Sequence, residues 1–565
     1  MTSRLQPFRL GATSHACVGV LLALAALPAH AEESATPSGV TWIDPAGIRG
    51  SLVIVGGGEL PAAVREKFFE LAGGKEARIV VIPTAREGEG FGKGEAIREG
   101  EAPAEPIGSA GASPSHLLEP WKSAGAADVQ VLHTRSKETA NAKAFVAPLK
   151  AATAVWLGGG DQSRLADAYL GTAVEREILA LLARGGVVGG TSAGAAIQSK
   201  TMIAGGQSEP KMATGLDLLP GAIIDQHFTR RQRQARLRLA LARHPGHVGF
   251  GVDEGTALIV QGRRLQVLGD SAVSVFLAAS ASRPVREFEL RPGEDHDLTM
   301  LRRAAIDRTL AQFPPQELPP ARLAHGSLVI VGGGGMPREA TERFIELAGG
   351  PDAPIVVLPT AIGEVIPDGA NDARLFERAG ARNVRVLKHR TRAEVESAEF
   401  AAALAEAKGV WFGGGRQWRF VDAYGGTRAE ALLHDVLRRG GVIGGSSAGA
   451  TIQGQYLVRG SALGNTEMMA EGYERGLAFL PGTAIDQHFS QRRRQADMTA
   501  VMHRFGQLLG IGIDERTALI VRGQTAEVVG AGQAHFYDYR AGPPTETPDY
   551  TAVPAGKQYD LVERK

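Results

Sequence analysis

Short apolar runs alternate with longer amphipathic segments along most of the chain. In the first half, the apolar runs occupy residues 52–55, 79–82, 129–133, 154–157 and 187–188. Between the first two runs, a proline opens a segment with Val64, Phe68 and Leu71 on one helical face, and two glycines end it. Strands that alternate with helices predict a parallel sheet covered on both faces. The later residues 257–269 predict an antiparallel hairpin at the edge of that sheet.

The pattern of the first half returns in the second half with many identical residues. The segment SLVIVGGG occurs at 51–58 and again at 327–334. The segment GGTSAGAAIQ at 189–198 returns as GGSSAGATIQ at 444–453. Two copies of one long unit indicate a duplicated globular domain rather than a solenoid, which stacks many short repeats.

The predicted fold class is therefore α/β, with two tandem doubly wound domains. Each domain is expected to be a mainly parallel sheet with helices on both faces and edge hairpins. We assign residues 45–303 to the first domain and 327–565 to the second, with a stiff, proline-rich linker at 304–326. Residues 87–115 are rich in glycine, glutamate, alanine and proline, and they are expected to be an inserted surface loop of the first copy.

The N-terminal residues carry the pattern of a secretory signal peptide. Arg4 and Arg9 precede an uncharged apolar run at 16–27, and AHA at 29–31 is a small-x-small cleavage site. We expect cleavage after Ala31 and a periplasmic or secreted protein. The alternative is an uncleaved anchor, but the run is shorter than the roughly 20 residues that span a bilayer.

Composition narrows the possible chemistry. The one cysteine, Cys17, lies in the expected signal peptide, so the mature protein would have no disulfide, no cysteine-ligated metal and no thiol nucleophile. The 62 basic and 61 acidic residues are balanced, and this argues against binding to nucleic acid or to a membrane surface.

Each copy contains the spacing G-x-S-x-G after an apolar run, centred on Ser192 and on Ser447. Before a helix, expected here from Ala195 onward, this spacing is typical of a nucleophile elbow, whose serine projects from a strained turn. The alternative is a plain tight turn. The candidate oxyanion donors are the amides of the next residue and of the GGG loop that ends another apolar run, namely Ala193, Gly159, Ala448 and Gly414.

A serine nucleophile needs a base, and each copy supplies a histidine within the segment DQHF, His227 or His488. A glutamate follows at the same spacing in both copies, Glu254 or Glu515. The chain order Ser, His, Glu differs from that of the α/β-hydrolases. The first glycine loop, VGGGELP, fails as a dinucleotide fingerprint because a proline occupies the position of the third glycine.

Several arginines follow His227 in the segment FTRRQRQARLR. Such a cluster can be a solvated helix face or a phosphate site. Its place beside the candidate base favours guanidinium groups that bind substrate carboxylates.

Together, GGTSAGA, GGGDQ, DQHF with its arginines, and the segment G-x-DE-x-TA resemble the cyanophycinase family. These serine exopeptidases are related to aspartyl dipeptidase and, in fold, to class I glutamine amidotransferases. The resemblance implies hydrolysis of cyanophycin, a poly-aspartate with arginine amide-linked to each β-carboxyl, to β-Asp-Arg dipeptides. It implies no metal and no cofactor.

When the family's roles are carried over by position, the resemblance implies that Ser192 is the nucleophile, that His227 is the general base and then the acid, and that Glu254 orients His227. Ser447, His488 and Glu515 are the equivalent residues of the second copy. The implied pocket residues are Gln162, Asp225, Gln226, Arg231, Arg233 and Arg236 in the first copy, and Gln417, Asp486, Gln487, Arg492 and Arg494 in the second.

The second copy departs from the first in places, and two of the changes alter charge beside the expected site. Arg416 replaces Asp161, and Asp497 replaces Arg236. An acid in place of an arginine reverses the local charge, so we expect a slower or altered second site, with a silent scaffold as the alternative. Two other functions stay open: a secreted peptidase for other acidic or isoaspartyl peptides, and a protein that binds cyanophycin without cleaving it. The two domains can also pair within the chain.

Overall fold

The structure is a computed structural model that describes residues 38–86, 115–363, 365–366 and 371–565. These residues all fall in one unit of the chain. The expected signal peptide, 1–31, and nearly all of the expected insertion, 87–115, lie outside the described residues. Within the described part, no helix has the length and apolar character needed to cross a membrane.

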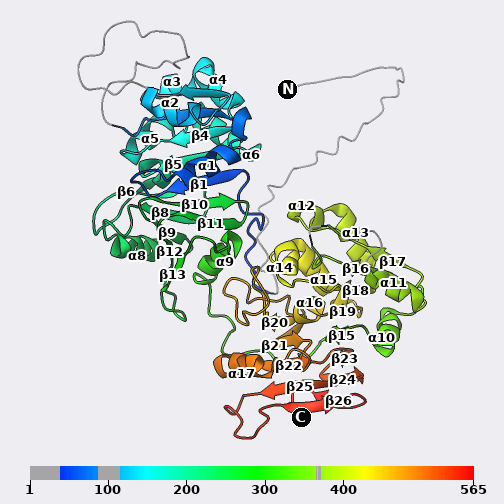
Figure 1. Ribbon diagram of the computed structural model, residues 1–565. Coiled ribbons are helices and arrows are strands. Elements are labelled where there is room, and N and C mark those ends of the chain that lie inside the picture. Colours follow the sequence, from blue (N-terminus) through cyan, green and yellow to red (C-terminus); the bar gives the residue numbers. More distant parts are fainter. Residues whose placement is uncertain (1–37, 87–114, 364, 367–370) are drawn as a thin grey trace, which may run out of the picture. The chain divides into compact units, whose positions relative to one another are not determined.

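Each copy is built on an eight-stranded sheet (Figure 1). In the first copy the order is β14 (His296–Asp297), β11 (Arg264–Gly269), β10 (Thr256–Gln261), β1 (Ser51–Val55), β5 (Val187–Thr191), β4 (Ala154–Leu157), β2 (Arg78–Ile82) and β3 (Asp128–Val131). In the second copy it is β17 (Val384–Val386), β16 (Ile355–Leu358), β18 (Gly409–Phe412), β19 (Val442–Ser446), β15 (Ser327–Val331), β23 (Thr517–Arg522), β24 (Thr525–Gly530) and β27 (Gln558–Asp560).

The parallel part of the sheet is buried on both faces, as its apolar runs predict. Strands β1, β5, β4, β2 and β3 pair in parallel, and β10 and β11 extend the sheet as the predicted antiparallel hairpin. In β1, Leu52 and Ile54 belong to one apolar cluster, whereas Val53 and Val55 belong to the cluster on the opposite face. This alternation follows from the two-residue period of a strand. The predicted α/β fold class is thereby confirmed.

Helices cover both faces of each sheet. In the first copy they are α1 (Ala62–Leu71), α2 (Ser115–Lys122), α3 (Lys137–Asn141), α4 (Lys143–Ala151), α5 (Gln162–Tyr169), α6 (Ala173–Ala183), α7 (Ala193–Ala196), α8 (Gln234–Arg243) and α9 (Leu298–Asp307), with a 3-10 turn at Gly74–Glu76. In the second copy they are α10 (Arg338–Ala348), α11 (Asn371–Arg378), α12 (Arg392–Val395), α13 (Ala398–Glu406), α14 (Trp418–Tyr424), α15 (Arg428–Arg438), α16 (Ala448–Thr451) and α17 (Gln495–Arg504).

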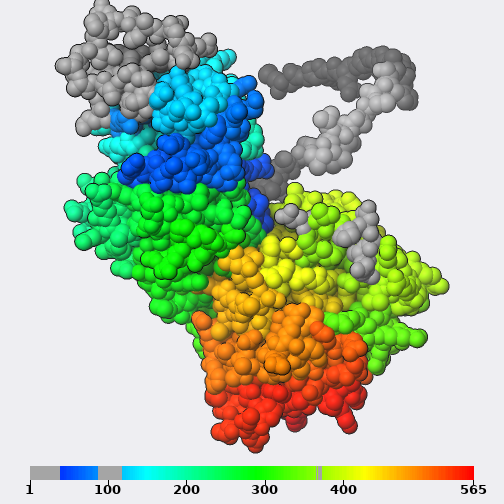
Figure 2. Space-filling view, in the orientation of Figure 1, coloured from blue at the N-terminus to red at the C-terminus, as the bar shows by residue number. Residues whose placement is uncertain are grey.

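A second, smaller sheet in each copy was not predicted. Its strands in the first copy are β13 (Arg286–Leu290), β12 (Val273–Leu277), β9 (Val248–Val252) and β8 (Ala222–Gln226), next to a separate hairpin of β6 (Thr201–Gly205) and β7 (Lys211–Thr214). In the second copy they are β20 (Gly454–Tyr456), β21 (Leu480–Gln487), β22 (Leu509–Ile513), β25 (Gln533–Asp538) and β26 (Thr551–Pro554). Figure 2 shows these segments and α17 as adjoining orange and red surface of the second copy.

The expected start of the linker at residue 304 falls inside a helix. Helix α9 continues to Asp307, and the side chain of Asp297 caps its first turn by accepting a hydrogen bond from Met300 N at 2.7 Å. The proline-rich segment therefore begins after this helix. Leu298, Leu301, Ala304 and Ala305 of α9 pack into the core of the first copy, which the sequence pattern around 304 did not reveal.

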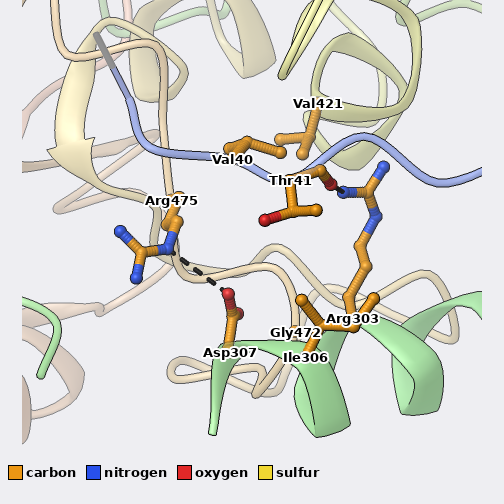
Figure 3. A pocket seen from close by; sticks show the side chains of 8 residues that line it. All are labelled: Val40, Thr41, Arg303, Ile306, Asp307, Val421, Gly472 and Arg475. Carbon is orange, nitrogen blue, oxygen red and sulfur yellow. Dashed lines mark hydrogen bonds and ion pairs between the residues drawn. The ribbon is translucent and has the colours of Figure 1, made fainter. Parts of the chain in front are cut away.

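Buried ion pairs join the two copies. Asp422 of α14 accepts hydrogen bonds from Arg263 at 2.7 Å, from Arg303 of α9 at 3.1 Å and from the Tyr473 hydroxyl at 2.7 Å. Figure 3 shows the neighbouring pocket, where Arg475 reaches Asp307 at 3.4 Å. These charged groups are largely buried, so each of them depends on its partner.

We expect Asp422→Ala to destabilise the protein by about 3–5 kcal/mol, because it leaves buried guanidinium groups without their carboxylate. The position that matches it in the first copy, Asp167, is exposed on α5. Asp167→Ala is therefore the matched control, with an expected change within about 0.5 kcal/mol. Unfolding in urea, followed by tryptophan fluorescence, measures both. Equal losses would contradict the assigned role of Asp422.

Candidate active site

The serine of each G-x-S-x-G segment follows the central strand directly. Strand β5 runs to Thr191, further than predicted, and Ser192 has φ 53° and ψ −109°. Ser447 has φ 55° and ψ −112° after β19. These are conformations that residues other than glycine rarely adopt, and they are typical of strained functional turns. The helix that follows starts at Ala193 and has four residues, so it begins before the expected Ala195.

Small neighbours make this turn possible. A Cβ on Gly190 would lie 2.2 Å from the carbonyl oxygen of Gly194, and a Cβ on Gly194 would lie 2.1 Å from that of Leu157. Both approaches are far below contact distance, so a larger residue would displace the backbone. The sequence spacing G-x-S-x-G is thus a steric requirement of the turn.

The serine, histidine and glutamate of each copy lie in one hydrogen-bonded row. Ser192 Oγ is 2.9 Å from His227 Nε2, and His227 Nδ1 is 2.6 Å from Glu254 Oε1. In the second copy the corresponding distances, from Ser447 through His488 to Glu515, are 3.0 and 2.6 Å. His227 follows β8 and Glu254 follows β9, so the row joins the small sheet to the main one. This is the arrangement in which an imidazole can accept the proton of a hydroxyl and a carboxylate can orient the imidazole.

Three successive carbonyl groups at the end of β1 hold the three residues in place. The carbonyl oxygen of Val55 accepts from Ser192 N at 3.0 Å, that of Gly56 from His227 N at 2.7 Å, and that of Gly57 from Gly255 N, next to Glu254, at 3.0 Å. The second copy repeats the set at the end of β15. There Val331, Gly332 and Gly333 accept from the amides of Ser447, His488 and Arg516 at 3.0, 2.7 and 2.7 Å.

The glycines of this loop, which we name the tether loop (residues 55–58 and 331–334), also make room for the imidazole. A Cβ on Gly57 would lie 2.2 Å from His227 Cε1, and Gly57 has φ +106°. Gly333 has φ +93° and would bring a Cβ within 2.4 Å of His488 Cε1. The sequence did not predict this role, because the loop was compared only with a dinucleotide fingerprint. Its unchanged return in both copies was the available signal of another role.

The surroundings of the imidazole keep it neutral at pH 7. Burial lowers the pKa of His227 below 6.5, although the hydrogen bond to Glu254 acts in the opposite direction. Burial raises the pKa of Glu254, but the hydrogen bonds from His227 and Arg230 outweigh it and leave the pKa below its usual value. In the second copy, burial also lowers the pKa of His488, while Gln491 takes the place of Arg230 and accepts a hydrogen bond from Glu515 N at 2.9 Å.

The candidate oxyanion donors lie next to the serine in both copies. Ala193 follows Ser192 at the start of α7, and a Cβ on Gly159 would lie 3.4 Å from Ser192 Cβ. In the second copy Ala448 follows Ser447, and a Cβ on Gly414 would lie 3.6 Å from Ser447 Cβ. Their role in binding an oxyanion stays a prediction.

An open pocket of about 620 Å³ adjoins Ser192. Five of the six residues that the resemblance assigned to the first pocket line it: Gln162, Gln226, Arg231, Arg233 and Arg236. The sixth, Asp225, does not, because its side chain is 1% exposed and lies behind the wall, where it binds Arg236 and Arg233. Its expected contact with substrate is therefore replaced by a structural role.

The arginines of this wall differ in what they can still bind. Arg233 donates to the carbonyl oxygen and to the side chain of Gln226, and Arg236 is buried against Asp225. Gln162 is also engaged, since its amide donates to the carbonyl oxygens of Ile203 at 2.8 Å and Ala204 at 3.0 Å. Arg231 is exposed, and among the described residues no side chain is seen to accept its hydrogen bonds.

The second copy keeps the same wall with a different arginine. Gln417 holds the carbonyl oxygens of Val458 and Arg459, at 3.1 and 2.7 Å. Arg494 binds Asp486 at 2.8 Å, and Arg459 binds both Asp486 and Asp497. The expected charge reversal at Asp497 is therefore offset by Arg459, which sequence reasoning missed because it lies outside the shared motifs. Of the other two predicted residues, Gln487 is buried and Arg492 is exposed.

The model of the family described as peptidase family S51 matches residues 116–268 and 328–529, one segment in each copy. The chain belongs to peptidase family S51. It is a serine peptidase that carries the family's domain in two tandem copies. This S51 peptidase therefore has two candidate active sites, one in each copy.

Curated relatives of the S51 peptidase are cyanophycinases. The cyanophycinase of Nostoc sp. is 36% identical over 244 residues, which are 41% of this chain and 74% of the relative. That of Geminocystis herdmanii is 33% identical over 241 residues, which are 40% of this chain and 80% of the relative. A solved peptidase from an acI-B1 actinobacterium is 24% identical and covers 45% of this chain and 98% of its own, with a TM-score of 0.32, too low to bear on the fold.

Gly57→Ala is expected to slow the reaction of Ser192 at least 100-fold, about the low end of a general base's contribution. The added methyl group would displace the His227 ring. The measurement is the rate at which an active-site-directed serine reagent labels the protein, in a Ser447→Ala background so that one site reacts. Gly171→Ala is the matched control, because Gly171 has φ +77° and no atom within 4 Å of its added Cβ. Similar rates in the two variants would contradict the steric role of Gly57.

The labelling rate of the Ser447→Ala protein is expected to rise with pH and to level off by pH 7. Only the neutral imidazole can accept the serine proton, and burial lowers the pKa of His227 from 6.5. Reactivity is therefore lost as pH falls through a midpoint below 6.5. The Ser192→Ala protein should show the same form, because burial also lowers the pKa of His488. A midpoint above 6.5 in either protein would contradict the neutral base.

Proposed function

We propose that the chain is an exopeptidase that hydrolyses cyanophycin and releases β-Asp-Arg dipeptides. The observation that carries this proposal is the pocket beside Ser192, which presents both an exposed guanidinium and an exposed carboxylate. Arg231 and Asp161 both line it, and both are exposed. Each unit of cyanophycin has a carboxylate and a guanidinium, so each unit offers a partner to both groups. The curated relatives named cyanophycinase support the same substrate.

The proposed mechanism follows the hydrogen-bonded row. Ser192 Oγ attacks the scissile carbonyl carbon while His227 Nε2 takes its proton, and Glu254 stabilises the imidazolium. The amides of Ala193 and Gly159 donate to the oxyanion. The amide bond then breaks as His227 returns the proton to the leaving nitrogen. Water, deprotonated by the same imidazole, hydrolyses the acyl-enzyme and restores the serine.

The contacts in the wall behind the pocket determine which arginine remains free to bind substrate. Arg233 and Arg236 are held by Asp225 and Gln226, so they keep their rotamers before substrate arrives. Arg231 is then the guanidinium free to bind the substrate carboxylate, and Asp161 is the acceptor for an arginine arm.

We extend the proposal to the second copy and to the location of the protein. Ser447, His488 and Glu515 would act as the first set does, with Gly414 and Ala448 as oxyanion donors. Residues 1–31 would direct the chain to the periplasm or out of the cell. A cyanophycinase in that location would act on polymer outside the cytoplasm.

The protein incubated with insoluble cyanophycin is expected to release β-Asp-Arg, identified by mass spectrometry. The Ser192→Ala, Ser447→Ala double variant should lose at least about 1,000-fold in rate, as serine hydrolases do without their nucleophile. The matched control is Ser446→Ala, Ser447→Ala, which also removes two hydroxyl groups but keeps Ser192. Cleavage of small isoaspartyl peptides with the polymer left intact would favour a peptidase for other substrates. Binding of the polymer without any product would favour a binding protein.

A further inference from the structure

In the second copy, two arginines make the contacts that one arginine, Arg236, makes in the first copy. In the first copy Arg236 binds Asp225, with Nε at 3.0 Å from Oδ2, and it also donates to the carbonyl oxygen of Gly206. The matching residue in the second copy is Asp497, which can do neither. The buried Asp486 and the loop carbonyl therefore need other donors, because unpaired buried polar groups are costly.

Arg459 supplies the first of these donors. Its place in the fold matches Ala204, since Gln162 holds the carbonyl oxygen of Ala204 and Gln417 holds that of Arg459. Its Nε lies 3.1 Å from Asp486 Oδ2, and its Nη2 lies 2.5 Å from Asp497 Oδ2. Its side chain is only 4% exposed. Arg459 therefore completes the wall and neutralises Asp497, but it presents little of its charge to a ligand.

Arg416 supplies the second donor. Counted from Ala204 and Arg459, the carbonyl of Gly206 matches that of Ser461, and Arg416 Nη2 donates to Ser461 at 3.1 Å. Arg416 comes from the loop before α14, at the position of Asp161. It is half-buried, and a guanidinium has five N–H donors, so one bond to Ser461 leaves others for a ligand.

At the position that matches Arg416, the first pocket carries the opposite charge. Asp161 is exposed, lines the pocket with Ser192, and caps α5 by accepting from Ser163 N at 2.8 Å. Arg416 thus changes the rim by two charge units, while Arg459 keeps the wall behind it intact. Among the described residues, Arg416 pairs with no buried carboxylate, so the fold does not require its charge in the way that it requires that of Arg459.

The geometry points to different substrate classes for the two sites: the first accepts aspartyl peptides that bear a guanidinium arm, and the second accepts aspartyl peptides that bear a carboxylate arm. This inference rests on the proposed peptidase function of both sites. Asp161 pairs with the cation in the first site, and Arg416 pairs with the anion in the second. The second site then acts on acidic, arginine-free chains that the first site binds poorly.

The test uses full-length proteins with one site left: Ser447→Ala for the first and Ser192→Ala for the second. The probes are two synthetic oligomers with the same aspartyl backbone, carrying arginine or glutamate amide-linked to each β-carboxyl. The measured quantity is the ratio of kcat/KM for the two oligomers, which does not depend on the fraction of folded protein. We expect this ratio to differ at least tenfold between the two proteins, with the Ser192→Ala protein favouring glutamate.

Charge substitutions make the test specific. Arg416→Asp in the Ser192→Ala protein should move the preference toward the arginine oligomer, and Asp161→Arg in the Ser447→Ala protein should move it toward glutamate. Arg438→Asp, which changes the same charge on the exposed part of α15, is the control and should leave the ratio unchanged. Labelling of Ser447 by a serine reagent shows that the Arg416→Asp site is still assembled.

The outcomes separate this inference from the function on which it rests. Equal ratios in the two proteins would overturn the inference and leave the peptidase function standing. So would cleavage by the Ser447→Ala protein alone, because the second site would then have no substrate. If the wild-type protein cleaves neither oligomer, the proposed function fails, and the inference fails with it.

Discussion

The site depends on three successive carbonyl groups at the end of one buried strand. Val55, Gly56 and Gly57 each accept a hydrogen bond from the backbone of, or next to, one residue of the serine, histidine and glutamate row. These residues come from different sheets and from distant parts of the sequence, yet a single backbone segment holds all of them in position. The hydrogen bonds from this segment help to hold Ser192 in its strained conformation and His227 at its positive φ of 48°.

The sequence predicts the main sheet well because buried parallel strands have a simple signature. Residues 154–157 are predicted and observed as a strand with the same ends, and Pro61 precedes the predicted helix as its N-cap. The small sheet was not predicted, in part because its edge strand β13 alternates charged and apolar residues instead of forming an apolar run. The sequence also placed the start of the linker inside α9. The buried face of this helix can be recognised only from the residues that pack against it.

For the site, shared motifs located the serines, histidines and glutamates, and the structure places them within hydrogen-bonding distance. Motifs could not separate residues that face the pocket from residues behind its wall. Asp225 and Arg231 lie six residues apart in the same segment, yet one is buried and the other exposed. Arg459 could not be found by alignment, because the charge that it replaces lies on a different element. Such exchanges become visible only when both partners of a buried ion pair are known.

The polar interface between the copies has a consequence for assembly. Asp422 contributes to it from the second copy, whereas its equivalent in the first copy, Asp167, is exposed, so the two copies meet through different faces. Contacts between unlike faces can repeat without limit, since each new unit offers a free face to the next. Here the repetition is interrupted in the sequence itself. Arg263, which binds Asp422, has Gln524 as its equivalent in the second copy, and Gln524 is bonded to Asp560. The second copy thus has no guanidinium at that position, so the contact that Arg263 makes with Asp422 cannot recur on the second copy in the same form.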